Sequence, residues 1–313
     1  MGRAGKADSL TLRLHADSSV IGIHITVAII SSGQAIRFLY RSALFFVISA
    51  CAGSLSPASG TTQNARVFVH AVVANELAAD ANDHSRWMYR DDNKTPELHT
   101  VKLVIQTSEG DLSKTVQKNG HPLTPEEQRE DEQRIDAFVR DAGLRQKQKQ
   151  DHAQDSQRAS SLTKMLPDAF LWTITGQNDS ETTLRFQPDP HFDPPTRESR
   201  VFAAMAGTMV VDTKQKRIKQ LKGALTRNVN FGYGLLGKLE KGGTFEIERQ
   251  QIAPGVWEIT STHVHIQGHA LIFKSIGEQQ DEMTAQYHPT PPSLTLAAAA
   301  KMLKDGSAAQ KLQ

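Results

Sequence analysis

Residues 203–225 read AAMAGTMVVDTKQKRIKQLKGAL, and this stretch predicts two strands joined by a turn. Two runs rich in apolar residues, 203–212 and 218–225, flank a polar segment that begins with the turn residues Asp212-Thr213-Lys214. Runs of this length bounded by turn residues are typical of β-strands. Because so short a connection has no room for a crossover helix, the two strands are predicted to pair antiparallel.

The same texture recurs along most of the chain. Further strands are predicted at 87–90, 99–107, 112–118, 169–175, 182–186, 244–249, 256–262, 265–274 and 283–287. Short strands in series with hairpin-length connections favour one antiparallel sheet over a parallel one. An amphipathic helix is predicted before the strands at 67–81, since apolar residues recur there at helical spacing.

A charged helical insertion is predicted at 124–166, within the strand series. Thr124 is a suitable N-cap, and it is followed by proline at the first helical position and by Glu127 at the third. Residues 145–161 are almost entirely polar, so this part is expected to be a solvated helix or a mobile arm. The insertion is predicted to end at Pro167.

The N-terminal residues 1–50 have the layout of a leader with a secretory signal peptide. Arg37 and Arg41 precede the uncharged apolar run 42–53, which is too short to span a membrane as a helix. Some 36 residues come before this signal, so the start of the chain is expected to be over-extended. A membrane anchor at 20–50 is the alternative, but it would place both arginines in the bilayer at about 2.5–3.5 kcal/mol each.

Cys51 is the only cysteine of the chain, so an internal disulfide is excluded. It follows Ile48-Ser49-Ala50, which resembles a bacterial lipoprotein processing box, and residues 51–64 have the composition of a flexible tether. Cys51 is therefore a candidate for lipid attachment and membrane association. The alternative is that Cys51 is removed with the leader, because Ala50-Cys51-Ala52 is also an ordinary cleavage site.

The charge of the chain argues against nucleic-acid binding, and its length limits the number of domains. Lys plus Arg number 36 against 34 for Asp plus Glu, so no basic excess points to nucleic acid. The roughly 260 residues after the leader suffice for one large domain or two small ones. We expect a domain at 65–290, followed by a C-terminal helix or tail at 291–313.

Two segments of the predicted domain carry a family resemblance. The strand Phe202 to Thr213 with its aspartate turn, and the run Gly255 to Thr262 leading into 268–273, look like the repeated strands of the periplasmic lipoprotein carriers. The chain thus resembles the LolA-like superfamily in architecture, over roughly residues 65–290. The resemblance implies an α+β fold in which a strongly curved antiparallel sheet, a half-barrel, is covered by helices and holds acyl chains.

The glycine pattern Gly232, Gly234 and Gly237 matches a dinucleotide-binding motif, but its context is wrong. The motif requires a helix directly after it, and Gly242-Gly243 follows too soon. A glycine-rich turn is the better interpretation, and no cofactor is predicted.

The histidines do not predict a metal site. His263 and His265 share one face of a strand, but alternation directs Val264 and Ile266 to the core and both histidines to solvent. His269 follows a glycine that shifts the register. A zinc site would also need further ligands.

A histidine between two acidic residues is better explained by the structure of a loop than by acid–base catalysis. His191 lies between Asp189 and Asp193, but the three prolines of 189–195 favour a fixed extended loop over an acid–base site. No catalytic motif is present, so enzyme activity is not predicted.

The predicted ligand cleft lies on the strand at 169–175. Phe170, Trp172 and Ile174 share one face of this strand, and in a half-barrel that face would meet an acyl chain. The preferred function is a non-catalytic, exported envelope protein, periplasmic or membrane-anchored, that binds lipid or the acyl chains of a lipoprotein. The alternative is an envelope scaffold that docks onto a protein partner through the charged helical arm.

Overall fold

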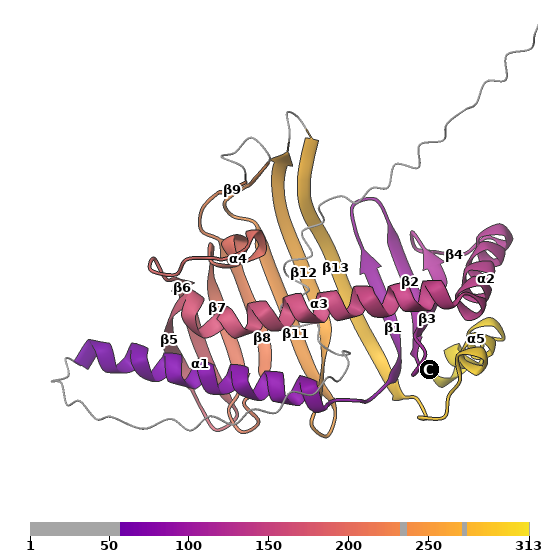
Figure 1. The fold of residues 1–313 in the computed structure, drawn as a ribbon, viewed down its shortest axis with the longest axis horizontal. Coiled ribbons are helices and arrows are strands. Elements are labelled where there is room, and N and C mark those ends of the chain that lie inside the picture. The colour runs from indigo at the N-terminus through magenta and orange to yellow at the C-terminus, as the bar shows by residue number, and fades with distance from the viewer. Residues whose placement is uncertain (1–56, 232–236, 271–273, 313) are drawn as a thin grey trace, which may run out of the picture.

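The computed structural model describes residues 57–231, 237–270 and 274–312, and it has an α+β fold with one large antiparallel sheet (Figure 1). The sheet is 13-stranded and open, in the order β4-β3-β2-β1-β13-β12-β11-β8-β7-β6-β5, while β9 and β10 pair beside β12. The strands are β1 Trp87–Lys94, β2 His99–Gln106, β3 Asp111–Lys118, β4 His121–Pro122, β5 Phe170–Gln177, β6 Glu181–Pro188, β7 Met205–Asp212, β8 Ile218–Leu225, β9 Val229–Phe231, β10 Gly237–Leu239, β11 Thr244–Ala253, β12 Val256–Ala270 and β13 Lys274–Pro289.

The predicted antiparallel sheet is therefore confirmed, including the pairing of β7 with β8 across the stretch 203–225. Most neighbours in the sheet are consecutive in the chain. The main exception is the pairing of β1 with β13, which joins residues about 190 positions apart at the centre of the sheet. This long-range pairing places the N-terminal strands beside the C-terminal ones and creates the site described below.

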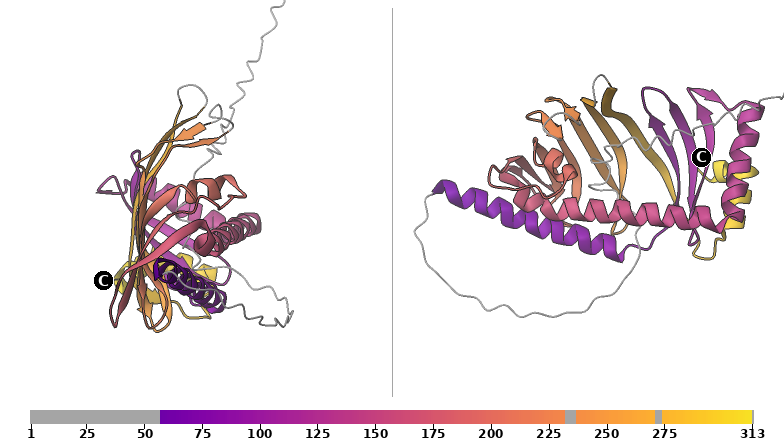
Figure 2. Two further views of the ribbon diagram at one scale, coloured as in Figure 1. Left: turned by 90° about the vertical axis from the view of Figure 1, so that its left-hand side faces the viewer. Right: turned by 45° about the horizontal axis from the view of Figure 1, so that its top comes forward.

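Two long helices lie side by side over one face of the sheet, as both views of Figure 2 show. They are α1 Pro57–Asn82 and α3 Ala142–Ala169. The helix predicted at 67–81 is thus confirmed, but it begins earlier, so residues 57–64 are helical and do not belong to a tether. The insertion predicted at 124–166 consists of α2 Pro125–Arg140 and most of α3, and its second half packs against α1.

Helix α3 continues past Pro167, so the prediction that it ends there was wrong. A proline inside a helix removes one backbone hydrogen bond, but here Leu166 and Ala169 on the same turns are fully buried against the sheet. The Leu166 carbonyl near the helix end accepts a hydrogen bond from the Trp172 indole at 3.0 Å. Burial and this bond offset the cost of the proline.

A second core lies on the opposite face of β1–β3. Leu103, Ile105 and Leu112 point away from α3 because they alternate with residues that face it. They pack against helices α2 Pro125–Arg140, α5 Leu296–Lys304 and α6 Ser307–Lys311. The capping box predicted at Thr124 and Glu127 starts α2 as expected, and the predicted C-terminal helix is α5.

Three boundaries in the second half of the chain differ from the sequence prediction. Residues 256–262 and 265–274 were predicted as two strands, whereas 256–270 form one strand, β12. Strand β13 begins much earlier than predicted, at Lys274, and a short helix, α4 Arg197–Phe202, precedes β7. Within the described ranges, no helix combines the length and apolarity needed to cross a membrane.

Candidate functional site: a polar cavity beneath helix α3

The predicted cleft residues lie in the main hydrophobic core, where α1 and the C-terminal half of α3 pack against the sheet. Phe170 and Trp172 are buried, and the Phe186 ring lies 4.8 Å and 5.4 Å from their rings, centroid to centroid. Phe202 packs on Phe170 from α4 at 4.8 Å. Ile174 is half-buried against the same core, and Leu171 points the other way, as the alternation predicted. Phe170 and Trp172 therefore contact other aromatic side chains in this structure.

A cavity of ≈ 320 Å³ lies elsewhere, between the middle of α3 and the centre of the sheet. Its walls come from β1, β12 and β13, from the ends of β2 and β3 at Gln106 and Asp111, and from α3 through His152, Asp155 and Ser156. The lining contains four aromatic residues and four acidic ones, with no lysine or arginine. It is thus a polar and electronegative cavity.

The aromatic lining is built on neighbouring strands. Tyr287 of β13 stacks on Tyr89 of β1 at 5.2 Å and meets Trp87 edge-on at 6.3 Å, centroid to centroid. The Tyr287 hydroxyl donates a hydrogen bond to Thr284 Oγ1 at 2.6 Å. Together with Trp257 of β12, these rings give the cavity a preorganised aromatic wall.

Two carboxylates in the cavity have no partner. Neither Asp111 nor Glu258 has a hydrogen bond or ion pair to its side chain within the described part of the chain, although both are half-buried. Burial raises the pKa of Glu258 to about 7, against a smaller opposing effect of Arg249. Burial likewise raises the pKa of Asp111 to about 6, although His152 and Arg86 oppose it. Each group would be stabilised by a proton or by another cation.

A third carboxyl of the lining, Glu282, is paired with another acid. Burial and the negative charge of Asp91 raise the pKa of Glu282 to about 7, and Gln280 donates a hydrogen bond to it at 3.0 Å. The Asp91 and Glu282 carboxyls lie close enough to act on each other, and a proton on one of them relieves their repulsion. Burial raises the pKa of Tyr89, and the negative charge of Asp111 raises it further. This second effect is expected in a cavity with a negative electrostatic potential.

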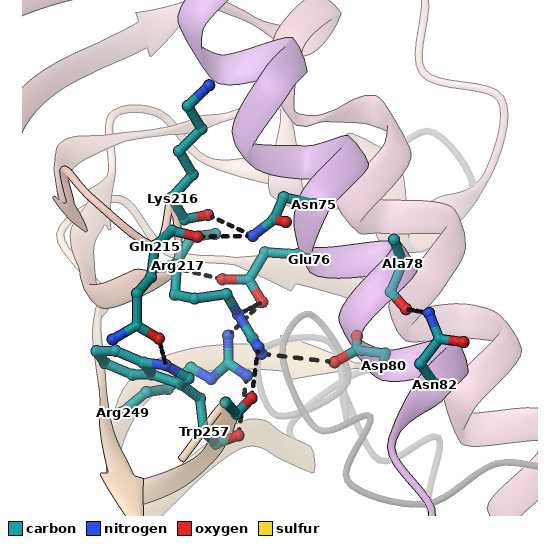
Figure 3. A network of polar contacts seen from close by, with 12 residues as sticks. Asn75, Glu76, Ala78, Asp80, Asn82, Gln215, Lys216, Arg217, Arg249 and Trp257 are labelled. Atoms are coloured by element: carbon teal, nitrogen blue, oxygen red, sulfur yellow. Dashed lines mark hydrogen bonds and ion pairs between the residues drawn. The ribbon is translucent and has the colours of Figure 1, made fainter.

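The β12 side of the cavity is held in place by a buried ionic network between α1 and the sheet (Figure 3). Glu76 Oε2 accepts hydrogen bonds from Arg217 Nε at 2.9 Å and from Arg249 Nη1 at 2.8 Å. Arg249 Nη2 in turn donates to the Trp257 carbonyl at 3.0 Å, and the Trp257 indole donates to Gln215 at 3.1 Å. Trp257 precedes Glu258, so this network fixes the backbone that carries the unpaired carboxylate.

Helix α3 is fastened over the other side of the cavity by Gln148. Its side-chain oxygen accepts from the Asp111 amide at 2.8 Å, and its side-chain nitrogen donates to the Asp111 carbonyl at 3.0 Å. These two bonds tie the polar half of α3 to the β2–β3 turn. The segment predicted as a solvated helix or mobile arm is thus an ordered cover whose inner side carries His152, Asp155 and Ser156.

His263 and His265 of β12 lie on the outer face of the sheet, as predicted, whereas Val264 and Ile266 are buried on the other face. His263 Nδ1 lies 2.7 Å from Asp281 Oδ1, and His265 Nε2 lies 3.1 Å from the same oxygen. The side chain of His269 is outside the described set. No group of three or more His, Cys, Asp or Glu side chains among those described is arranged to hold a metal ion.

The same cluster resembles a catalytic triad, because Ser261 Oγ lies 3.0 Å from His263 Nε2. It lacks the surroundings that a triad needs. Ser261 lies in mid-strand, where β12 is hydrogen-bonded to β11 and β13, so the amides of the ladder are not free to form an oxyanion hole. We therefore assign His263, His265 and Asp281 to the polar outer surface, whereas Ser261 is buried.

The remaining sequence candidates lie away from the cavity wherever the structure describes them. Residues 232–236 of the glycine pattern lie outside the described ranges, and Gly237 begins a strand, β10, where the dinucleotide motif requires a helix. His191 is highly exposed and contacts Asp189 at 3.2 Å in the loop after β6. Cys51 and the leader also lie outside the described residues.

Sequence reasoning missed Asp111, Glu258 and Glu282, and no local pattern marks them as a group. In β13 the usual alternation is inverted, because Met283 is 59 % exposed while Glu282 faces the cavity. Comparisons of the chain with protein-family models, curated proteins and solved structures find no match.

Proposed function

We propose that this is a non-catalytic binding protein whose cavity holds a small organic cation. The observation that carries the proposal is the pair of unpartnered carboxylates, Asp111 and Glu258, in a cavity with an aromatic wall and no lysine or arginine in its lining. A carboxylate withdrawn from water must take up a proton or pair with a cation. An ammonium group provides that pairing.

The aromatic wall supports a cation over a neutral ligand. Aromatic faces attract ammonium groups by about 0.5–2 kcal/mol per contact, depending on how far the pair is desolvated. Trp87, Tyr89, Trp257 and Tyr287 line the same cavity as the acids. The combination of unpaired carboxylates and aromatic rings favours a protonated amine over an anion or an acyl chain.

Isothermal titration with n-butylamine at pH 8 tests the proposal. We expect binding to the wild-type protein and at least tenfold weaker binding to Glu258→Gln, because the variant keeps the shape of the side chain but loses its charge. Glu130→Gln is the matched control, since Glu130 is exposed on α2 and its loss changes the net charge equally. No binding to the wild-type protein, or equal affinity in both variants, would reject a cation site in this cavity.

The half-barrel form and the acyl-carrier role implied by the LolA-like resemblance form a second proposal. It is favoured by the two helices α1 and α3, which cover one face of an open antiparallel sheet (Figure 2). A fluorescent fatty-acyl probe that binds the folded protein, and is not displaced by n-butylamine, would support this role. Absence of probe binding would remove it and leave the amine site or the protein-docking scaffold.

Export and lipidation of Cys51 belong to the same second proposal. Incorporation of labelled palmitate into the wild-type protein and into Cys51→Ser tests them. Labelling that depends on Cys51 is expected for an envelope lipoprotein, whereas equal labelling or none excludes that form of membrane association.

A further inference from the structure

The two unpartnered carboxylates stand at opposite ends of the cavity. Asp111 belongs to β3 and Glu258 to β12, and the sheet order β3-β2-β1-β13-β12 puts three strands between them. Four strand spacings of about 4.8 Å separate the two main chains by roughly 19 Å along a flat sheet, less where the sheet bends. A single ammonium group therefore does not reach both carboxylates.

The residues between the two ends form one row across the sheet. Asp111 is directly opposite Gln106, and the Gln106 side chain accepts a hydrogen bond from the Trp87 amide at 2.9 Å. The rings of Trp87 and Tyr287 follow on β1 and β13, in contact with each other, and Glu258 lies on the next strand. The lining of the cavity thus runs across five strands, with a carboxylate on each outer strand and aromatic rings on strands between them.

The charges that act on the two ends also differ. Those near Asp111 are His152 and Arg86, whereas those near Glu258 are Arg249, Arg217 and acids of α1 and the segment after it. None of these groups forms a hydrogen bond or ion pair with either carboxylate in the described structure. Each end consequently offers its own carboxylate to a cation.

We infer that the cavity takes a linear ligand with an ammonium group near each end, as diamines and polyamines have. Each ammonium group pairs with one carboxylate, and the aliphatic chain between them lies along the aromatic rings, where its methylene groups are withdrawn from water. The inference rests on the proposed function, because it assigns the ligand class of the same site.

Competitive titration with octane-1,8-diamine and n-octylamine at pH 8 tests this ligand class. The two ligands share chain length and differ in the second ammonium group. We expect the diamine to bind the wild-type protein at least tenfold more tightly. In Asp111→Asn the affinity for the diamine should decrease to that for the monoamine, because only Glu258 is left to pair with an ammonium group. The affinity for n-octylamine, which pairs with Glu258, should change by less than twofold.

The comparison of the two ligands on the wild-type protein tests the two-ended site even if a variant fails to fold. Equal or tighter binding of n-octylamine overturns the two-ended site and leaves the proposed amine-binding function intact. Failure of both ligands to bind overturns the inference and the proposed function together. A diamine that loses affinity equally in Asp111→Asn and in the surface control Glu130→Gln also contradicts the inference, since the effect would then follow net charge alone.

Discussion

Helix α3 covers two regions of the same sheet, and these regions differ in the polarity of their side chains and in how completely those side chains fill the space. Under its C-terminal half, Leu162 and Leu166 belong to the same packed apolar core as Trp172 and Phe186. Under its middle, the residues that face the sheet are polar, and the space beneath them is the acidic cavity. Since one helix and one sheet form both regions, the difference comes from side chains alone. The first region stabilises the fold, and the second leaves polar groups for a ligand to satisfy.

The largest expected effect lies in the packed region. Trp172→Glu puts a charge where the side chain is 0 % exposed, and we expect a loss of about 5 kcal/mol or more, enough to unfold the protein. Leu171→Glu is the matched control, because Leu171 lies on the same strand but is 45 % exposed and should change stability by about 0.5 kcal/mol or less. Circular dichroism of both variants measures this. A folded Trp172→Glu protein would show that this region is not the core.

A smaller loss is expected at the network that joins the two regions to α1. Glu76→Gln leaves Arg217 and Arg249 buried without their shared carboxylate, which should cost about 3–5 kcal/mol in unfolding free energy. Urea denaturation of this variant measures the loss in unfolding free energy. Glu97→Gln, at an exposed position, is the control. Equal midpoints for the two variants would mean that the network does not anchor α1.

A still smaller effect should appear as a pH dependence of the unfolding free energy, caused by the acidic side chains of the cavity. Glu258 and Glu282 have pKa values of about 7 in the fold and near 4.5 when unfolded, so the native state binds more protons between these limits. The unfolding free energy should therefore fall as pH rises from about 4.5 to 7. Because both groups are only half-buried, we expect a change of about 1–3 kcal/mol between pH 5 and pH 8.

Urea denaturation at the two pH values measures this change, and Glu258→Gln should reduce it. The variant also removes an uncompensated charge, so it should be at least as stable as the wild-type protein at pH 8. A protein that is more stable at pH 8 than at pH 5 would contradict an excess of unpaired carboxylates in the cavity.

Local patterns in the sequence predicted the elements of the fold well. The Thr124 capping box, the hairpin of β2 and β3 and the outward histidines of β12 all follow from contacts within a few residues or from simple alternation. Predictions failed where distant packing outweighed a local signal. Pro167 is a strong helix breaker, yet the burial of Leu166 and Ala169 carries α3 past it.

The site escaped prediction because it depends on the pairing of β1 with β13. That pairing brings Tyr89 beside Tyr287 and places Asp111 and Glu258 in one cavity, although they are far apart in the chain. The aromatic strand residues were assigned to a ligand wall at Trp172, but the rings that line the cavity are those of other strands. At Glu282 the usual rule of apolar residues inward is reversed, as is common where a protein holds polar groups for function.

The most direct measurement is a carbon-13 NMR titration of the glutamate side chains in the ligand-free protein. Loss of one resonance in Glu258→Gln assigns that carboxyl. We expect Glu258 to titrate with a midpoint near 7, and we expect octane-1,8-diamine to lower that midpoint by favouring the carboxylate. A midpoint near 4.5 that the diamine does not move would show that the carboxylate is already compensated, and the cavity would then have no need of a cation.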